Sequence, residues 1–143
     1  MRVAIVGSRK YPDLDRVRRE VETLPAGTVV VSGGAPGVDR VAAETARARG
    51  LEVIEIKPDW EKHGKSAGML RNPLIVKDAD LVWAFWDGVS KGTKNTIRHA
   101  QTKCKVVKLF ISQKEPYMEG KSPDMVIFDE FLFNNPHDPN AKS

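Results

Sequence analysis

Apolar residues in this chain fall into short, nearly continuous runs separated by segments in which they recur at helical spacing. The first such segment places Val17, Val21 and Leu24 on one helical face and charged residues on the other. The apolar runs occupy residues 2–6, 29–31, 51–56, 79–85 and 106–111. Continuous apolar runs that alternate with helical segments are typical of parallel strands covered by helices on both faces of the sheet. The pattern predicts an α/β fold: a Rossmann-like three-layer domain with a mostly parallel sheet of about five strands, spanning residues 1–112.

Residues 57–67 show no sustained period, and they predict a long loop of the kind that is often functional. Within it, Lys65 is expected to cover a phosphate, and Trp60 either covers a base or fills the edge of the core. The next helix is expected to begin near Pro73, because proline is tolerated only near a helix start. Arg71 and Asn72 would then lie at its amino end, where they either contact a ligand or tie the long loop down.

Residues 113–143 depart from the alternating pattern and are rich in proline and charge. We expect them to form a C-terminal extension whose last ten or so residues are disordered. A hydrophobic island at residues 125–133 needs a surface to cover it. It would lie on its own domain or against a second copy, which makes a homo-oligomer a candidate assembly.

The formal net charge of +4 makes contact with anions plausible, although the basic residues are scattered along the chain. No apolar run approaches the roughly 20 residues that cross a bilayer, and residues 1–7 are too short and strand-like for a signal peptide. A cytoplasmic protein is therefore expected.

Cys104 is the only cysteine, which excludes an intramolecular disulfide and a cysteine-based metal site. Its spacing from Ile97 and Ala100 predicts the buried stripe of a helix, so core packing is favoured over a nucleophilic role. The three histidines lack the paired spacing of metal ligands, and neither a metal nor another cofactor is expected. They are His63, His99 and His137.

The candidate chemistry lies in loops that follow the predicted strands, because the carboxyl ends of parallel strands share one edge of the sheet. Residues 29–39 read as a strand, a glycine turn and a helix start. Residues 86–95 follow the fourth strand as a second glycine-containing turn that enters a helix, and both stretches are candidate phosphate cradles. The spacing matches neither a P-loop nor the usual dinucleotide fingerprint, which favours phosphate held by backbone amides without magnesium. The candidate ligand- and phosphate-binding residues are Gly7, Ser8, Arg9, Ser32, Gly33, Gly34, Gly37, Arg71, Asn72, Ser90, Lys91, Gly92 and Thr93.

Two carboxylates are candidate catalytic residues at the same edge. Asp87 follows the fourth strand, and Asp39 lies in the first turn of a helix. Asp39 either caps that helix against its dipole or presents a carboxylate to a sugar or a reacting atom.

Four motifs in order resemble the SLOG superfamily, and within it the small branch with the DUF2493 domain that includes YspA. They are Val-Gly-Ser-Arg at 6–9, Val-Ser-Gly-Gly-Ala-Pro-Gly-Val-Asp at 31–39, Ala-Gly-Met-Leu-Arg-Asn at 67–72 and Ala-Phe-Trp-Asp-Gly-Val-Ser-Lys-Gly-Thr at 84–93. The resemblance covers about residues 2–110 and leaves out the C-terminal extension. It implies a Rossmann-like domain that binds a nucleotide or a nucleotide-derived ligand.

The resemblance leaves the activity open between a sensor and an N-glycosidic phosphoribohydrolase. The LOG enzymes of this superfamily carry a Pro-Gly-Gly-x-Gly-Thr motif followed by a glutamate, and residues 89–96 here contain no glutamate. Asp39, Glu44 or Asp87 would have to supply the carboxylate that an oxocarbenium-like transition state requires. The main alternative is a single-stranded nucleic-acid-binding protein that resembles DprA, and a further one is a unit that only oligomerises.

Overall fold

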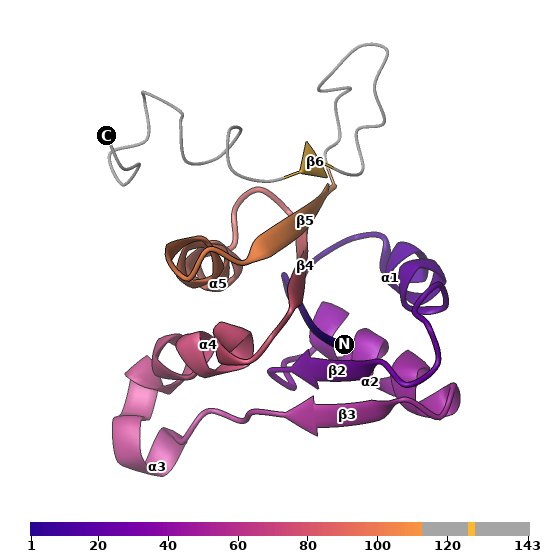
Figure 1. The fold of residues 1–143 in the computed structure, drawn as a ribbon. Coiled ribbons are helices and arrows are strands. Elements are labelled where there is room, and N and C mark those ends of the chain that lie inside the picture. Colours follow the sequence, from indigo (N-terminus) through magenta and orange to yellow (C-terminus); the bar gives the residue numbers. More distant parts are fainter. Residues whose placement is uncertain (113–125, 128–143) are drawn as a thin grey trace.

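The computed structural model describes residues 1–112 and 126–127, which form a single sheet with helices on both faces (Figure 1). The sheet has the order β3-β2-β1-β4-β5-β6, with five parallel strands and a short antiparallel β6 on the edge. The predicted fold class is confirmed. The strands are β1 (Arg2–Gly7), β2 (Val29–Ser32), β3 (Glu52–Glu55), β4 (Leu81–Trp86), β5 (Val106–Ile111) and β6 (Val126–Ile127).

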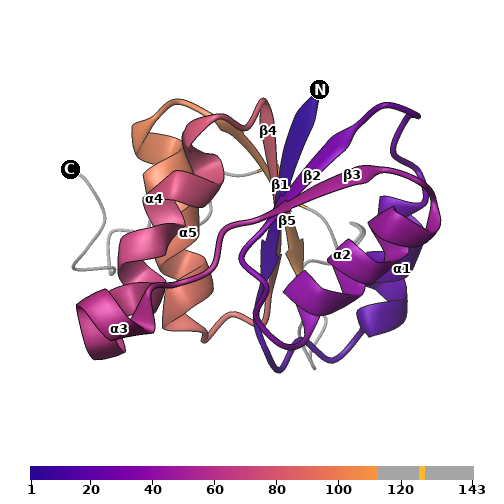
Figure 2. The same cartoon turned by 90° about the horizontal axis from the view of Figure 1, so that it is seen from below.

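The helices form two layers, one on each face of the sheet (Figure 2). One layer holds α1 (Leu14–Val21) and α2 (Val38–Ala48), and the other holds α4 (Ala67–Lys77) and α5 (Lys91–Thr102). The chain changes face after β3, and β4 then pairs with β1 on the side opposite β2. The strand order therefore reverses between β1 and β4, which is where open α/β sheets bind ligands.

Each of the five parallel strands sends alternate residues into two separate cores. In β4, Trp83 and Phe85 face α1 and α2, whereas Val82 and Ala84 face α4 and α5. Phe85 stacks on Phe110 with ring centroids 4.3 Å apart. Burial on both faces explains why the strands read as continuous apolar runs in the sequence.

The segment that was predicted as a long loop contains two short helical elements. They are α3 (Trp60–His63) and the 3₁₀ turn η1 (Gly64–Ser66). Asp59 caps α3 by accepting the Lys62 N–H at its Oδ1 atom over 3.1 Å. The loop prediction is wrong for residues 60–66, because a four-residue helix is too short to produce a period in the sequence.

The helix predicted to begin near Pro73 begins six residues earlier, at Ala67, and Pro73 lies inside α4. The proline removes one backbone N–H from the helix. Burial of Ile75 and Val76 against the sheet outweighs that loss. Arg71 and Asn72 consequently lie in the second turn of α4 and not at its amino end.

Cys104 is exposed, so the prediction that it packs in the core is wrong. Helix α5 ends at Thr102, and Cys104 adopts a left-handed φ of 56° just beyond it. Its N–H donates to the Gln101 carbonyl, and the Lys105 N–H donates to the Ala100 carbonyl, both over 2.9 Å. This pairing closes the end of the helix and turns residue 104 away from the buried stripe, where Ile97 and Ala100 lie as predicted.

The predicted C-terminal extension lies outside the described residues except for β6. Its apolar island, its disordered end and the homo-oligomer that it would mediate therefore stay predictions. Within residues 1–112 and 126–127, no helix is long and apolar enough to cross a membrane.

Candidate functional site

A cleft of about 420 Å³ opens at the carboxyl edge of the sheet, where the strand order reverses. The loops after β1, β2 and β4 line it together with α4 and α5. Nine of the predicted site residues belong to this lining, namely Gly7, Arg9, Asp39, Arg71, Asn72, Asp87, Ser90, Gly92 and Thr93.

The other predicted residues lie outside the lining, and two of them hold the loops in place. The buried Ser8 hydroxyl accepts the Asp87 N–H over 3.2 Å and thereby joins the ends of β1 and β4. The buried Ser32 hydroxyl accepts the Gly34 N–H over 3.2 Å and donates to the Asp39 carbonyl over 3.4 Å. The six residues outside the lining are Ser8, Ser32, Gly33, Gly34, Gly37 and Lys91.

The turn from β2 into α2, residues 33–37, surrounds the carboxylate of Asp39. Its Oδ2 atom accepts the Ala35 N–H over 3.3 Å, and its Oδ1 atom is buried without a hydrogen-bond partner among the described residues. Burial raises the pKa of Asp39 to about 6, although the amides of Ala35, Gly7 and Gly33 and the charge of Arg71 act to lower it. The first turn of α2 therefore carries a carboxylate of the chain itself, held by amides that precede the helix.

The glycines of this turn make room for neighbouring parts of the protein. A β-carbon at Gly33 would lie 2.8 Å from the Arg71 guanidinium and 2.9 Å from the Asp39 Oδ2 atom. A β-carbon at Gly37, where φ is 85°, would lie 2.6 Å from the Arg9 carbonyl oxygen. Both glycines thus serve the approach of one part of the chain to another.

Arg71 and Asn72 tie α4 to its surroundings. Nη1 of Arg71 donates to the carbonyls of Gly33 and, over 3.2 Å, Ile56. Burial lowers the pKa of Arg71, and the nearby Arg9 adds to that effect while Asp39 opposes it; the guanidinium stays charged at neutral pH. Asn72 is buried, and its Nδ2 donates to Asn95 on α5 over 2.9 Å.

The turn from β4 into α5, residues 87–90, is closed by its own side chains, and the Ser90 Oγ atom caps the helix by accepting the Thr93 N–H over 3.5 Å. The Asp87 Oδ1 atom accepts the N–H groups of Val89 and Ser90 over 2.9 and 2.8 Å. Burial would raise the pKa of Asp87, but these amides and the Ser8 hydroxyl outweigh it and the pKa is lowered. Among the described residues, a β-carbon at Gly92 would meet no atom within 4 Å apart from its own helix and chain neighbours, so this first turn of α5 faces open space where it lines the cleft.

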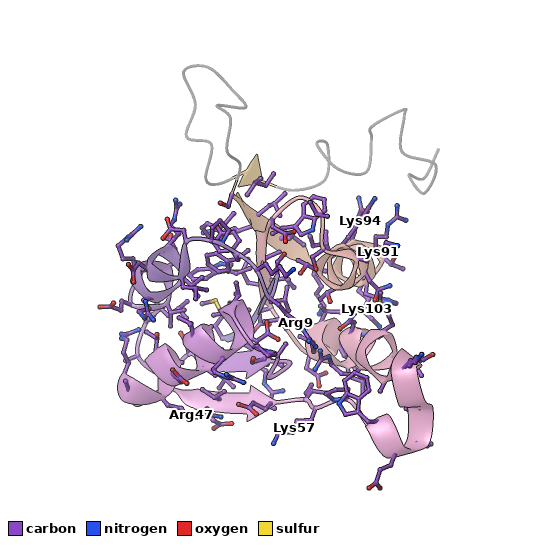
Figure 3. All side chains as sticks on the ribbon, turned by 180° about the vertical axis from the view of Figure 1, so that it is seen from behind. Arg9, Arg47, Lys57, Lys91, Lys94 and Lys103 are labelled. Carbon is purple, nitrogen blue, oxygen red and sulfur yellow. The ribbon has the colours of Figure 1, made fainter. Side chains whose placement is uncertain are left out.

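Four cations and two carboxylates line the cleft. Arg9 lies near the middle of the molecule, between α2 and the layer of α4 and α5, whereas Lys94 lies on the far side of α5 (Figure 3). Lys65, which the sequence predicts to cover a phosphate, belongs to the lining, whereas Lys10 was not predicted and adjacency to Arg9 was its only signal. The cations are Arg9, Lys10, Lys65 and Arg71, and the carboxylates are Asp39 and Asp87.

The part of the chain that the structure describes has no group of three or more His, Cys, Asp and Glu side chains arranged to hold a metal ion. The arrangement offers amides, hydroxyls and cations to an anionic ligand.

Solved structures with a similar fold include two DNA processing proteins. DprA from Streptococcus pneumoniae matches with a TM-score of 0.62 and 20% identity, over 79% of this chain and 51% of that one. DprA from Helicobacter pylori, described for its single-stranded DNA binding mode, matches with a TM-score of 0.57 and 24% identity, over 82% and 67%. TM1055 matches with a TM-score of 0.57 and 24% identity, over 74% and 71%. The chain thus spans about half the length of the pneumococcal protein, and these identities establish a shared fold.

Sequence comparison gives the family. The gene 61 protein of Mycobacterium phage D29 is 42% identical over 110 residues, which cover 70% of this chain and 88% of that protein. The family model described as the YspA, cpYpsA-related SLOG family matches residues 1–63. The chain belongs to the SLOG superfamily, in the branch related to YspA and cpYpsA.

Proposed function

We propose that the cleft binds a nucleotide or a nucleotide-derived ligand, with a phosphate at the amino end of α5. The observation that carries this proposal is the empty space beside Gly92, in the first turn of a twelve-residue helix that lines the cleft. The first turn of a helix presents N–H groups without intrahelical partners, and the helix dipole favours an anion there. A glycine at this point lets a ligand approach the backbone.

The amino end of α2 is a poorer phosphate site. Asp39 lies in the first turn of α2, and its Oδ2 atom accepts the N–H of Ala35 in the turn that precedes the helix. A phosphate beside this carboxylate would also meet like charge. We therefore assign the phosphate to α5 and the sugar to the part of the cleft between Asp39 and Asp87.

The dimensions and charge of the cleft support a ligand of this class. Its volume of about 420 Å³ lies within the range of about 300 to 1,000 Å³ that is usual for small-molecule sites. The lining cations outnumber the lining carboxylates, so the cleft favours a ligand with net negative charge.

The test is calorimetric titration of AMP and of inorganic phosphate into the protein and its Gly92→Asp variant. An aspartate at residue 92 fits the empty space and suits the start of a helix, yet it places like charge where the phosphate would lie. We expect a loss of at least about tenfold in affinity for both probes, as befits charge-assisted hydrogen bonds.

Ala26→Asp is the matched control, because it adds the same charge in an exposed turn just before β2, at the opposite edge of the sheet. It should bind both probes like the wild type. Equal affinities in Gly92→Asp and wild type, or no binding by the wild type, would contradict the assignment.

Hydrolysis of an N-glycosidic bond is a second proposal, supported by the two carboxyl groups of the cleft. The pKa of Asp39 is raised to about 6 and that of Asp87 is lowered, and oppositely shifted pairs are typical of acid–base chemistry. Water would add to C1′ as the bond to the base breaks, and Asp87 would stabilise the positive charge that develops on the sugar. Asp39 would protonate the leaving base and regain a proton from the added water. Release of ribose 5-phosphate from AMP should then fall at least a hundredfold in both Asp39→Asn and Asp87→Asn; unchanged rates in both would refute it.

Single-stranded nucleic acid is the competing ligand, in keeping with the DNA binding described for the similar H. pylori structure. The cations Arg9, Lys10 and Lys65 would contact the backbone of a strand. Binding of oligothymidylate should then weaken steeply with salt, by a slope proportional to the number of phosphates neutralised. Tighter binding of AMP than of the oligonucleotide at fixed salt would exclude this alternative.

A further inference from the structure

Trp60 is a large aromatic side chain left in solvent beside the cleft. It is 53% exposed, whereas Trp83 and Trp86 are 5% and 6% exposed. The expectation that it fills the edge of the core is therefore excluded. An indole with no role in the core is typical of residues that contact a ligand or a partner.

Trp60 lies outside the cleft lining but next to residues that belong to it. The Asp59 cap holds the start of α3, and the Cη2 atom of Trp60 lies 3.9 Å from where a β-carbon of Gly68 would be. Gly68 lines the cleft, as do its neighbours Lys65 and Met69. Helix α3 itself lies at the outer end of α4 (Figure 2).

We propose that Trp60 and Met69 form the platform on which the base of the bound nucleotide stacks, so that the site requires an aromatic base and not merely a sugar phosphate. This inference rests on the proposed nucleotide site and names the class of ligand that it takes. The platform adjoins the cleft lining through Gly68, and the neighbouring Lys65 ammonium supplies charge complementary to a phosphorylated ligand.

The chemistry of the two side chains suits a base. Every nucleobase presents a π-face, and an indole stacks on that face whichever hydrogen-bonding groups the base carries. A thioether is polarisable and packs well against aromatic rings, and Met69 is 42% exposed and therefore accessible. Stacking of one base on an aromatic side chain changes affinity by roughly 5- to 100-fold.

The experiment compares AMP with ribose 5-phosphate on the full chain, by calorimetry and by tryptophan fluorescence. The variants are Trp60→Ala, Trp60→Phe and the control Leu74→Ala, which removes another exposed apolar side chain of the same region outside the cleft lining. Trp86 donates its Nε1–H to the carbonyl of Ser90 in the cleft lining, so a change in emission on binding reports on Trp60 where it is absent from Trp60→Ala. Thermal melts establish that each variant is folded.

We expect the wild type to bind AMP roughly 5- to 100-fold more tightly than ribose 5-phosphate, with a change in emission. Trp60→Ala should lose most of this preference while its affinity for ribose 5-phosphate stays within twofold. Trp60→Phe and Leu74→Ala should keep it.

Four results would overturn the inference. Equal binding of AMP and ribose 5-phosphate by the wild type refutes the platform and leaves the phosphate site standing, whereas absence of binding by both removes the proposed function as well. If the emission changes with protein concentration but not with AMP, and if Trp60→Ala and Leu74→Ala both alter sedimentation, the indole lies in a contact between copies of the protein. Quenching by oligothymidylate but not by AMP assigns it to a nucleic acid strand.

Discussion

The turn from β2 into α2 and the turn from β4 into α5 look alike in the sequence but differ in what their helices face. Both join a buried strand to a helix through glycines at the same edge of the sheet. The first turn of α2 contains Asp39, whose carboxylate is buried against the amide of Ala35. The first turn of α5 contains no acidic residue, and Gly92 there faces open space.

Under the proposed assignment of the phosphate to α5, a glycine-rich turn before a helix is not by itself a site for an external anion. An acidic residue in the first helical turn can occupy that position from within the chain. In this protein the glycines of the turn from β2 into α2 make room for Asp39, Arg71 and the Arg9 backbone. No other segment of the described residues lies within 4 Å of a β-carbon at Gly92. An acidic residue in the first turn of the helix, present in α2 and absent from α5, is thus the feature of the sequence that distinguishes the two helix starts.

Gly37→Ala should have the largest effect on stability. The new β-carbon would lie 2.6 Å from the Arg9 carbonyl oxygen, at a φ of 85° that other residues rarely adopt. Overpacking and backbone strain together should lower the free energy of unfolding by roughly 3 to 5 kcal/mol, or the Tm by roughly 10 to 20 °C. Urea or thermal unfolding measures it, and a loss below about 1 kcal/mol would show that the turn is less tightly packed than described.

Asp39 should make stability fall as the pH rises from about 4 to about 6. In this window the folded state keeps a proton on Asp39 that the unfolded chain has released, because burial raises the folded pKa to about 6 from an ordinary value near 3.8. The free energy of unfolding should decrease by about 3 kcal/mol across the window, and below pH 4 the penalty is absent.

Asp39→Asn supplies the comparison for that pH series, measured by urea unfolding at each pH. His99, whose lowered pKa acts in the opposite direction as the pH falls, contributes equally to both proteins, so the difference isolates Asp39. Parallel pH profiles for the two proteins would mean that Asp39 is not a buried, titrating group.

Arg71→Ala should destabilise the protein by roughly 1 to 3 kcal/mol at pH 7.5, where it removes the donor to the Gly33 and Ile56 carbonyls and the positive charge near the Asp39 carboxylate. The loss should be smaller at pH 5, where Asp39 is protonated. Arg71→Lys keeps the charge but not the shape of the guanidinium, so its stability should lie between those of Arg71→Ala and the wild type. A loss that is the same at both pH values would contradict the coupling of Arg71 to Asp39.

Gly92→Ala should have the smallest effect and the opposite sign. A methyl group meets no neighbouring side chain there, and alanine favours a helix over glycine, so the free energy of unfolding should rise by about 0.5 kcal/mol. A differential thermal melt against wild type detects this shift. A decrease in Tm would show that residue 92 is packed against the protein, and the contrast with Gly37 would disappear.

The sequence by itself determined the layers and the edge at which the site lies. Strands buried on both faces must be apolar along their whole length, and helices on a sheet must be apolar on one side, so residues such as Ile5, Phe85, Val17 and Ile97 carry a local signal of their place. Parallel connectivity then brings the loops after β1, β2 and β4 together, whatever their side chains.

Only the tertiary structure decided which polar groups face the cleft and which hold it together. Ser8 and Ser32 lie in the predicted loops, yet both hydroxyls are consumed by backbone partners that depend on how β1, β2 and β4 are placed. Arg71 contacts carbonyls that lie 38 and 15 residues earlier in the chain, and Trp60 stays exposed although the sequence allowed it to be buried. Hydrogen bonds and burial of this kind depend on distances between segments remote in sequence, which no local pattern of residues encodes.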